Sequence, residues 1–116
     1  MTSEKVARLA GAGIDVTDAL NRFMGNEGLL ERFLNKFLSD QNFKKLGEAI
    51  AAGDNESALL ASHTLKGVCG NLSMTTLSEL LTKQVKAYRD GNHDLAESMM
   101  PEITSAYDKV VSAISE

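Results

Sequence analysis

Apolar residues recur along this chain at helical spacing, three or four positions apart, and no stretch alternates like a β-strand. Proline and glycine are scarce within the long periodic segments, and no internal repeat or long linker separates them. Four long amphipathic segments with short connections predict an all-α fold, an antiparallel four-helix bundle with one or two short additional N-terminal helices. At 116 residues the chain suits one hydrophobic core. We expect residues 1–11 to form an N-terminal segment with a short helix over 4–10, and residues 12–116 to form the bundle domain.

Capping residues and glycines predict where the early helices begin and end. Asp15 or Thr17 is expected to cap a short helix that stops near Gly25. Asn26 is expected to cap the first long helix, and Asp54 the second.

Two of the long segments contain irregularities. In the first, the stripe of Leu30, Phe33, Leu34 and Phe37 faces away from that of Phe43, Leu46 and Ile50, so the helix either bends near residues 39–42 or packs its halves against different neighbours. In the last, Pro101 removes a backbone hydrogen bond and is expected to kink or split the helix. Between the second and the third long helices, Ser73 or Thr75 is the expected N-cap of the third helix.

Charge and composition exclude several classes of protein. Twelve Lys and Arg against sixteen Asp and Glu give a net charge of −4 without any long basic run, which disfavours nucleic acid as a partner. Apolar runs of only a few residues predict no membrane insertion. The first residues lack the apolar core of a signal peptide, and the lone Cys69 provides no disulfide framework. We therefore expect a cytoplasmic protein.

The helix around residues 55–71 carries an unusual polar face. On a helical wheel its core-facing side holds Ala58, Ala61, Leu65, Val68, Cys69 and Leu72. The opposite side holds His63, Lys66, Gly67 and Gly70, at positions i, i+3, i+4 and i+7.

Two glycines on one helix face cost on the order of 2 kcal/mol relative to alanine. Something must therefore gain from the missing side chains, and close approach of another backbone is the usual gain. The approaching backbone is either a neighbouring helix of the bundle or a docking protein, and the polar His63 and cationic Lys66 on the same stripe favour docking.

The chemistry of this face points to a nucleophilic histidine. An imidazole is substantially neutral at pH 7 and then offers one ring nitrogen as a nucleophile. His63 has no second His or Cys on its face for a metal site, Cys69 projects toward the core, and His93 lies in a turn. Lys66 would offset negative charge on a group that another protein brings to His63, such as a phosphoryl.

The stretch "HTLKGVCGNL" inside a helical bundle resembles the histidine-containing phosphotransfer (HPt) domain of multistep phosphorelays. The family pattern of His followed by Leu-Lys-Gly corresponds to His63, Leu65, Lys66 and Gly67, and the resemblance extends over about residues 12 to 115. Two departures are Ser73, where the family often has glycine, and Ser62, where it often has alanine.

The resemblance implies that His63 accepts a phosphoryl group, through Nε2, from an aspartyl phosphate of one receiver domain and passes it to another. It implies that Lys66 lies near the phosphoryl and that Gly67, with Gly70 and Arg89, belongs to the receiver-docking surface. Gln84 is the candidate for orienting the imidazole, with Val85 as the competing position. No kinase activity and no cofactor of its own are expected, because the receiver supplies Mg²⁺. The expected partners are receiver domains of response regulators or a hybrid sensor histidine kinase, bound by a monomer.

Two other hypotheses remain at this point. The chain could be a helical binding module that docks a receiver or a sensor kinase without carrying phosphate, although a module of that kind has no need of His63 and Lys66 together. A small metal-binding bundle is the third reading, and the lack of clustered ligands opposes it. The sequence is compatible both with a stand-alone protein and with one domain of a hybrid kinase.

Overall fold

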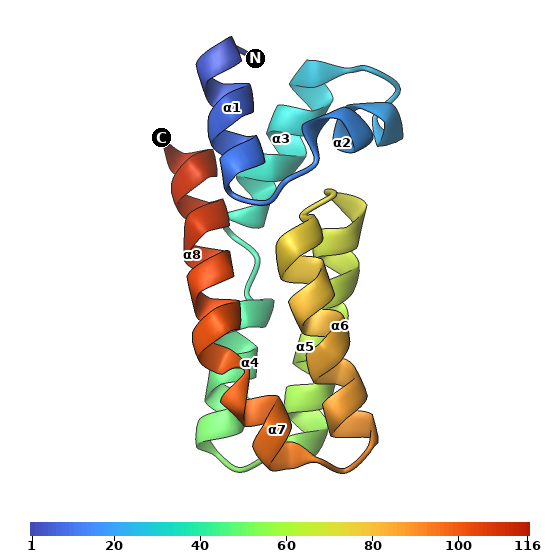
Figure 1. Cartoon of the computed structure of the whole chain (residues 1–116), viewed down its shortest axis with the longest axis vertical. Coiled ribbons are helices and arrows are strands. Elements are labelled where there is room, and N and C mark those ends of the chain that lie inside the picture. Colours follow the sequence, from blue (N-terminus) through green and yellow to red (C-terminus); the bar gives the residue numbers. More distant parts are fainter.

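Two of the four predicted long helices are continuous in the structure, a computed structural model that describes residues 1–116. They are α5 (Asn55–Asn71) and α6 (Thr75–Arg89), which form an antiparallel pair joined by a short turn (Figure 1). Every regular element of the chain is a helix, and the all-α prediction is confirmed.

The other two predicted helices are each divided into two. The first consists of α3 (Glu27–Phe37) and α4 (Asn42–Ala51), and the last of α7 (His93–Ser98) and α8 (Met100–Ser115). Pro101 lies in the first turn of α8, where its missing N–H is not needed, so the prediction of a split helix is confirmed. The result is the predicted antiparallel four-helix bundle, in which the first and the last helix are each interrupted once.

The break between α3 and α4 lets each helix bury its own apolar stripe. Leu30, Leu34 and Phe37 of α3 are buried, as is Leu46 of α4. Phe33, which the sequence places in the same stripe, keeps 38% of its surface exposed. The core continues through residues of all the long helices, among them Leu65, Cys69, Leu81, Ile103 and Val110.

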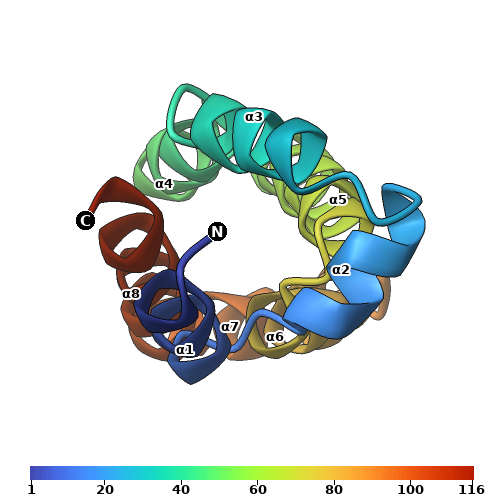
Figure 2. The same cartoon turned by 90° about the horizontal axis from the view of Figure 1, so that it is seen from above.

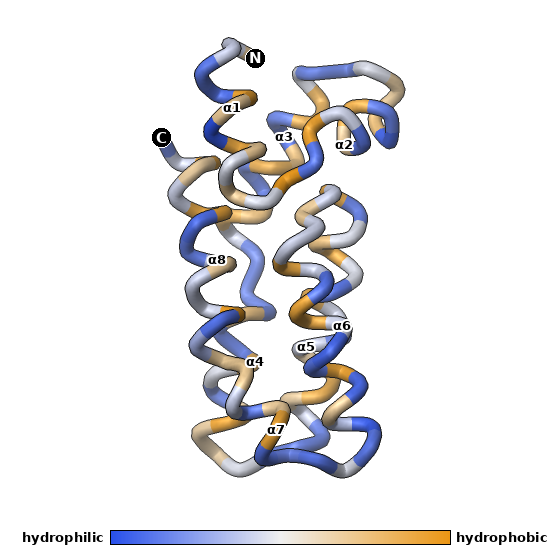
Figure 3. Tube along the Cα trace, in the orientation of Figure 1, coloured by the Kyte–Doolittle hydropathy of each residue, from blue (hydrophilic) through white to orange (hydrophobic).

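Two short N-terminal helices complete the fold, α1 (Ser3–Gly11) and α2 (Val16–Arg22). Seen along the bundle axis, α1 lies beside the end of α8, and α2 lies over the end of the α5–α6 pair (Figure 2). Leu9 of α1 is fully buried in the common core. The molecule is elongated, 42 × 24 × 20 Å, and hydrophobic and hydrophilic positions intermingle along every helix (Figure 3).

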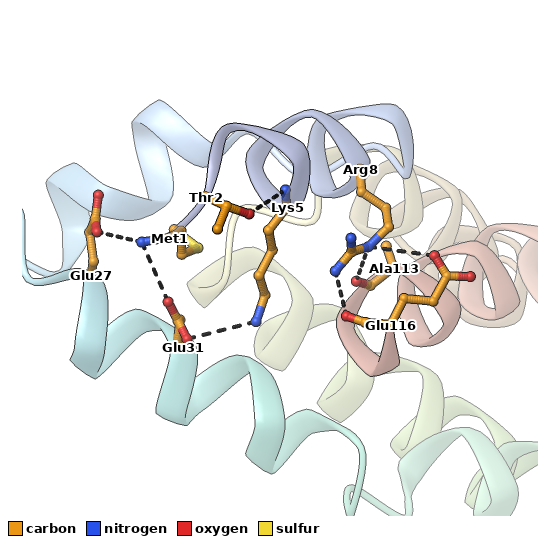
Figure 4. A network of polar contacts seen from close by, with 8 residues as sticks. All are labelled: Met1, Thr2, Lys5, Arg8, Glu27, Glu31, Ala113 and Glu116. Atoms are coloured by element: carbon orange, nitrogen blue, oxygen red, sulfur yellow. Dashed lines mark hydrogen bonds and ion pairs between the residues drawn. The ribbon is translucent and has the colours of Figure 1, made fainter.

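Polar contacts join α1 to two other helices (Figure 4). The side chain of Arg8 donates to the backbone oxygens of Ala113 at 3.0 Å and Glu116 at 2.5 Å, both at the end of α8. The ammonium group of Met1 lies 2.6 Å from a carboxylate oxygen of Glu27 on α3. The carboxylates of Glu27 and Glu116 are more than half exposed, so these ion pairs contribute little compared with the packing of Leu9.

The predicted N-caps are confirmed for three helices and wrong for one. In α2, α3 and α5 a side-chain oxygen of the cap accepts from the backbone N–H group three residues further on, at 3.0 to 3.1 Å; the capping residues are Asp15, Asn26 and Asp54. Helix α6 instead begins after Met74, which is buried and makes no side-chain capping bond. The tertiary contacts of the α5–α6 turn decide this start rather than a local cap.

Ser73 has a structural role in that turn. Its φ of +54° lies in the left-handed region, where a side chain costs free energy and glycine does not. The Ser73 hydroxyl donates to Asp18 Oδ2 at 2.5 Å, and its carbonyl accepts from the Asp15 N–H at 2.8 Å. Both bonds join α2 to the α5–α6 turn, so the hydroxyl compensates for the strained backbone.

Replacing Ser73 with alanine should lower stability in a pH-dependent way. The bond from Ser73, with a smaller contribution from Arg22, lowers the pKa of Asp18 below its ordinary value of 3.8. A lowered pKa in the folded state contributes stability above the unfolded value and loses it as the pH falls through the folded pKa. Chemical denaturation of Ser73→Ala and wild type should therefore differ most at neutral pH and least at the lowest pH where both still fold. Ser73→Gly is the control. It loses the same hydrogen bond but adopts the left-handed φ without strain, so it should be the more stable of the two variants.

Candidate functional site

The burial of side chains along α5 agrees with the core-facing and polar sides that the helical wheel predicts. Leu65 and Cys69 are fully buried against the bundle, whereas His63 and Gly67 are exposed and Lys66 and Gly70 are half-buried. His63, Lys66, Gly67 and Gly70 thus form a solvent-facing strip on this 17-residue helix, and His63 lies more than two turns from either end of the helix.

Neither glycine of the strip is required by packing inside the bundle. A Cβ added at Gly67 would meet nothing within 4 Å, and one added at Gly70 would meet only Ser78 Oγ at 3.8 Å, an ordinary contact. Of the two explanations for the glycines, close approach by a neighbouring helix is excluded at Gly67. The cleared surface beside His63 faces solvent, where another molecule can approach.

Two cations near His63 are not paired within the chain. The ion pairs of the structure use Lys5, Arg8, Arg22, Lys86 and the N-terminus, and none of them involves Lys66 or Arg89. Lys66 lies one turn after His63 on α5, and Arg89 lies at the end of α6. Arg89 and His63 line one shallow hollow, so the structure brings these two predicted residues together.

Sequence reasoning missed an exposed leucine in the same hollow. Leu59 and Leu60 line it together with His63, and Leu60 is 68% exposed. Leu60 precedes His63 by three residues, so the spacing of the wheel would have placed it on the polar face. The hollow therefore combines an exposed leucine, the imidazole and the Arg89 guanidinium on one face of the molecule.

Gln84 makes no hydrogen bond to the imidazole, and its side chain is engaged in the interior instead. Gln84 is fully buried, and its Oε1 accepts from Ser62 Oγ at 2.7 Å. Its Nε2 donates to the carbonyl of Ala96 at 3.0 Å and contacts Met100 Sδ at 3.2 Å. The competing position, Val85, is buried and apolar. Gln84 thus joins α5, α6 and α7 from the interior, and Ser62 is a serine because it completes this buried bond.

The other candidate nucleophiles lie elsewhere. Burial raises the pKa of the Cys69 thiol to about 12, which keeps it protonated at neutral pH. His93 is exposed at the start of α7, with its ring 6.0 Å from that of Tyr88. The chain has no group of three or more His, Cys, Asp and Glu side chains arranged to hold a metal ion. No helix combines the length and apolar character that a membrane crossing requires.

The arrangement around His63 agrees with the comparisons with known proteins. The family model of the Hpt domain matches residues 29–113. This range is most of the chain, and it includes His63 and nearly all of the four-helix bundle. Searches among curated proteins and among solved structures gave no significant match. The chain belongs to the Hpt domain family, the phosphocarriers of histidine phosphotransfer in two-component phosphorelays.

Proposed function

We propose that His63 is the phosphoacceptor and that it relays a phosphoryl group between the aspartates of two receiver domains. The observation that carries the proposal is the solvent-facing strip of α5, on which an exposed histidine lies beside Gly67, whose missing side chain no neighbour within the chain requires. A receiver must bring its aspartyl phosphate to about 3 Å from the attacking nitrogen, and that needs open space beside the imidazole.

The transfer needs few groups from this chain. The lone pair of His63 Nε2 attacks phosphorus, the P–O bond to the receiver's aspartate breaks, and its electron pair stays on the departing carboxylate. The product has an N–P bond, and Nδ1 keeps its proton. Reversal of the same step onto a second receiver completes the relay. Because no proton has to be removed from the nucleophile, positioning and charge stabilisation carry the catalysis.

The unpaired cations supply charge stabilisation from this side of the complex. Lys66, one turn from His63, would face the phosphoryl oxygens, and Arg89 would face acidic groups of the receiver. We propose that Mg²⁺ comes with the receiver's acidic pocket and that the chain has no kinase activity of its own.

The test is a phosphotransfer panel. The full chain is incubated with each phosphorylated receiver domain of the source organism, and the phosphate on the chain is tested for lability. Label that is lost in acid and kept in base is expected, since phosphohistidine behaves in this way. Complex formation without any transfer would instead identify a binding module, and acid-stable label would exclude histidine as the acceptor.

A further inference from the structure

Ser62 and Gln84 form the one side-chain hydrogen bond that joins α5 to α6. Both residues are fully buried, and Ser62 Oγ donates to Gln84 Oε1 at 2.7 Å. The other buried residues of the two helices are aliphatic, apart from Cys69 and Tyr88. This polar pair therefore lies in an interface that is otherwise held by apolar packing.

The amide of Gln84 is also bonded to the interrupted last helix of the bundle. Its Nε2 donates to the carbonyl of Ala96 at 3.0 Å. Ala96 is one of the last four residues of α7, whose carbonyls lack the usual partner one turn further on, because α8 starts separately at Met100. Ala96 is fully buried, and the Met99 N–H lies at a longer 3.3 Å from its carbonyl. Gln84 is thus held at both ends of its amide, against α5 and against α7.

A buried polar pair restricts the register of two helices more than apolar contacts do. Apolar side chains can meet new apolar partners when helices shift. A shift that separates Ser62 from Gln84, in contrast, leaves a buried hydroxyl and a buried amide without partners. Single buried polar residues specify register in coiled coils for the same reason. We therefore expect the pair to hold α5 and α6 in one register.

This pair lies next to the two residues of the candidate site that come from different helices. His63 directly follows Ser62 on α5, and Arg89 follows Gln84 by five residues on α6. His63 lies about 100° around α5 from Ser62, and Arg89 lies about 140° around α6 from Gln84. Both are exposed and line the same hollow. The separation of the imidazole and the guanidinium consequently depends on the register of α5 against α6.

We propose that Ser62 and Gln84 are positioning residues for phosphotransfer, because their hydrogen bond fixes the separation of His63 and Arg89. This proposal rests on the proposed function. A receiver has to bring phosphorus to His63 Nε2 and an acidic group to Arg89 in the same docked position. A misplacement of about 1 Å can slow such a positioned reaction by about two orders of magnitude.

Ser62→Ala removes the hydroxyl and leaves Gln84 Oε1 without its donor. Transfer at saturating concentrations of phosphorylated receiver should fall about tenfold, because the imidazole and the guanidinium no longer keep their separation. The probe is the receiver domain of the source organism that phosphorylates the full wild-type chain fastest. Phosphorylation by phosphoramidate, which reaches His63 without a docked protein, should stay close to wild type.

A double-mutant cycle with Arg89→Ala distinguishes positioning from a general effect on the fold. Arg89→Ala alone should slow transfer from the receiver. If Ser62 acts through the separation of His63 and Arg89, Ser62→Ala should slow transfer in wild type and cause little further loss in the Arg89→Ala background. A general weakening of the fold would slow transfer by the same factor in both backgrounds.

Two further variants separate register from stability. Ser62→Ala combined with Gln84→Met replaces both polar partners by apolar groups, a change that is tolerated better than the loss of one partner. This double variant should fold, yet transfer as slowly as Ser62→Ala. Cys69→Ala is the matched control, because it also removes one heavy atom from a fully buried position, seven residues further along the same face of α5. It should transfer phosphate as wild type does.

Nuclear Overhauser contacts between side chains of α5 and α6 report the register without any receiver. They should change in both variants that contain Ser62→Ala and stay as in wild type in Cys69→Ala. Unchanged contacts in the Ser62 variants would overturn the proposal, as would wild-type transfer by either of them. An equal loss of transfer in Cys69→Ala, or equal slowing in the Arg89→Ala background, would overturn it as well. A wild-type chain that no receiver phosphorylates would contradict the proposed function, while the contacts between the helices would still decide the register.

Discussion

Replacing His63 with glutamine should reduce phosphate acceptance from any receiver to background. Glutamine keeps the polarity and approximate size of the exposed side chain but offers no nucleophilic nitrogen lone pair. Because the imidazole is exposed, the free energy of unfolding should stay within about 0.5 kcal/mol of wild type. Labelled phosphate on the chain after incubation with a phosphorylated receiver measures the loss, and chemical denaturation verifies the fold.

His93→Gln is the matched control for this result. His93 is the other histidine of the chain, and it is also exposed at a helix surface, so the variant makes the same chemical change away from α5. It should accept phosphate as wild type does. Transfer to His63→Gln at the wild-type rate, or its loss in His93→Gln, would show that the acceptor has been misassigned.

The parts of the fold that the sequence predicted correctly depend on local chemistry. The side chains of Asp15, Asn26 and Asp54 each accept from the backbone N–H group three residues further on, a local bond that depends little on the rest of the fold. Pro101 likewise lacks an N–H in every environment, so the split before α8 was predictable. The polar face of α5 follows from helical geometry alone, and the resemblance to HPt domains added the chemistry.

The incorrect predictions concern residues whose role depends on distant partners. The sequence suggested Gln84 as a partner of the imidazole and gave Ser62 no role, whereas packing places Gln84 against Ser62 in the interior. Ser73 reads as a helix cap, but its bond to Asp18 spans 55 residues of sequence. In each case the deciding contact is tertiary, and neither spacing nor propensity encodes it.

Gly67 should show opposite effects on stability and on transfer. Gly67→Ala places a methyl group in open space within a helix, so helix propensity should raise the free energy of unfolding by up to about 1 kcal/mol. The same methyl group occupies the strip next to His63 and should slow transfer from a receiver. The longer side chain of Gly67→Gln should slow it further, while phosphorylation of either variant by the small donor phosphoramidate stays close to wild type.

Gly47→Ala separates these two effects. Gly47 lies inside α4, where an added Cβ also meets nothing within 4 Å, so this variant should gain a similar amount of stability. It should transfer phosphate as wild type does, because the residue lies on another helix. If Gly67→Ala and Gly67→Gln transferred at the wild-type rate, the strip would not be the approach path of the receiver. If Gly67→Ala were destabilised, an unrecognised packing role would account for the glycine. A gain in stability together with a loss of transfer at Gly67, and only the gain at Gly47, would mean that the glycine is kept for docking at a cost to the fold.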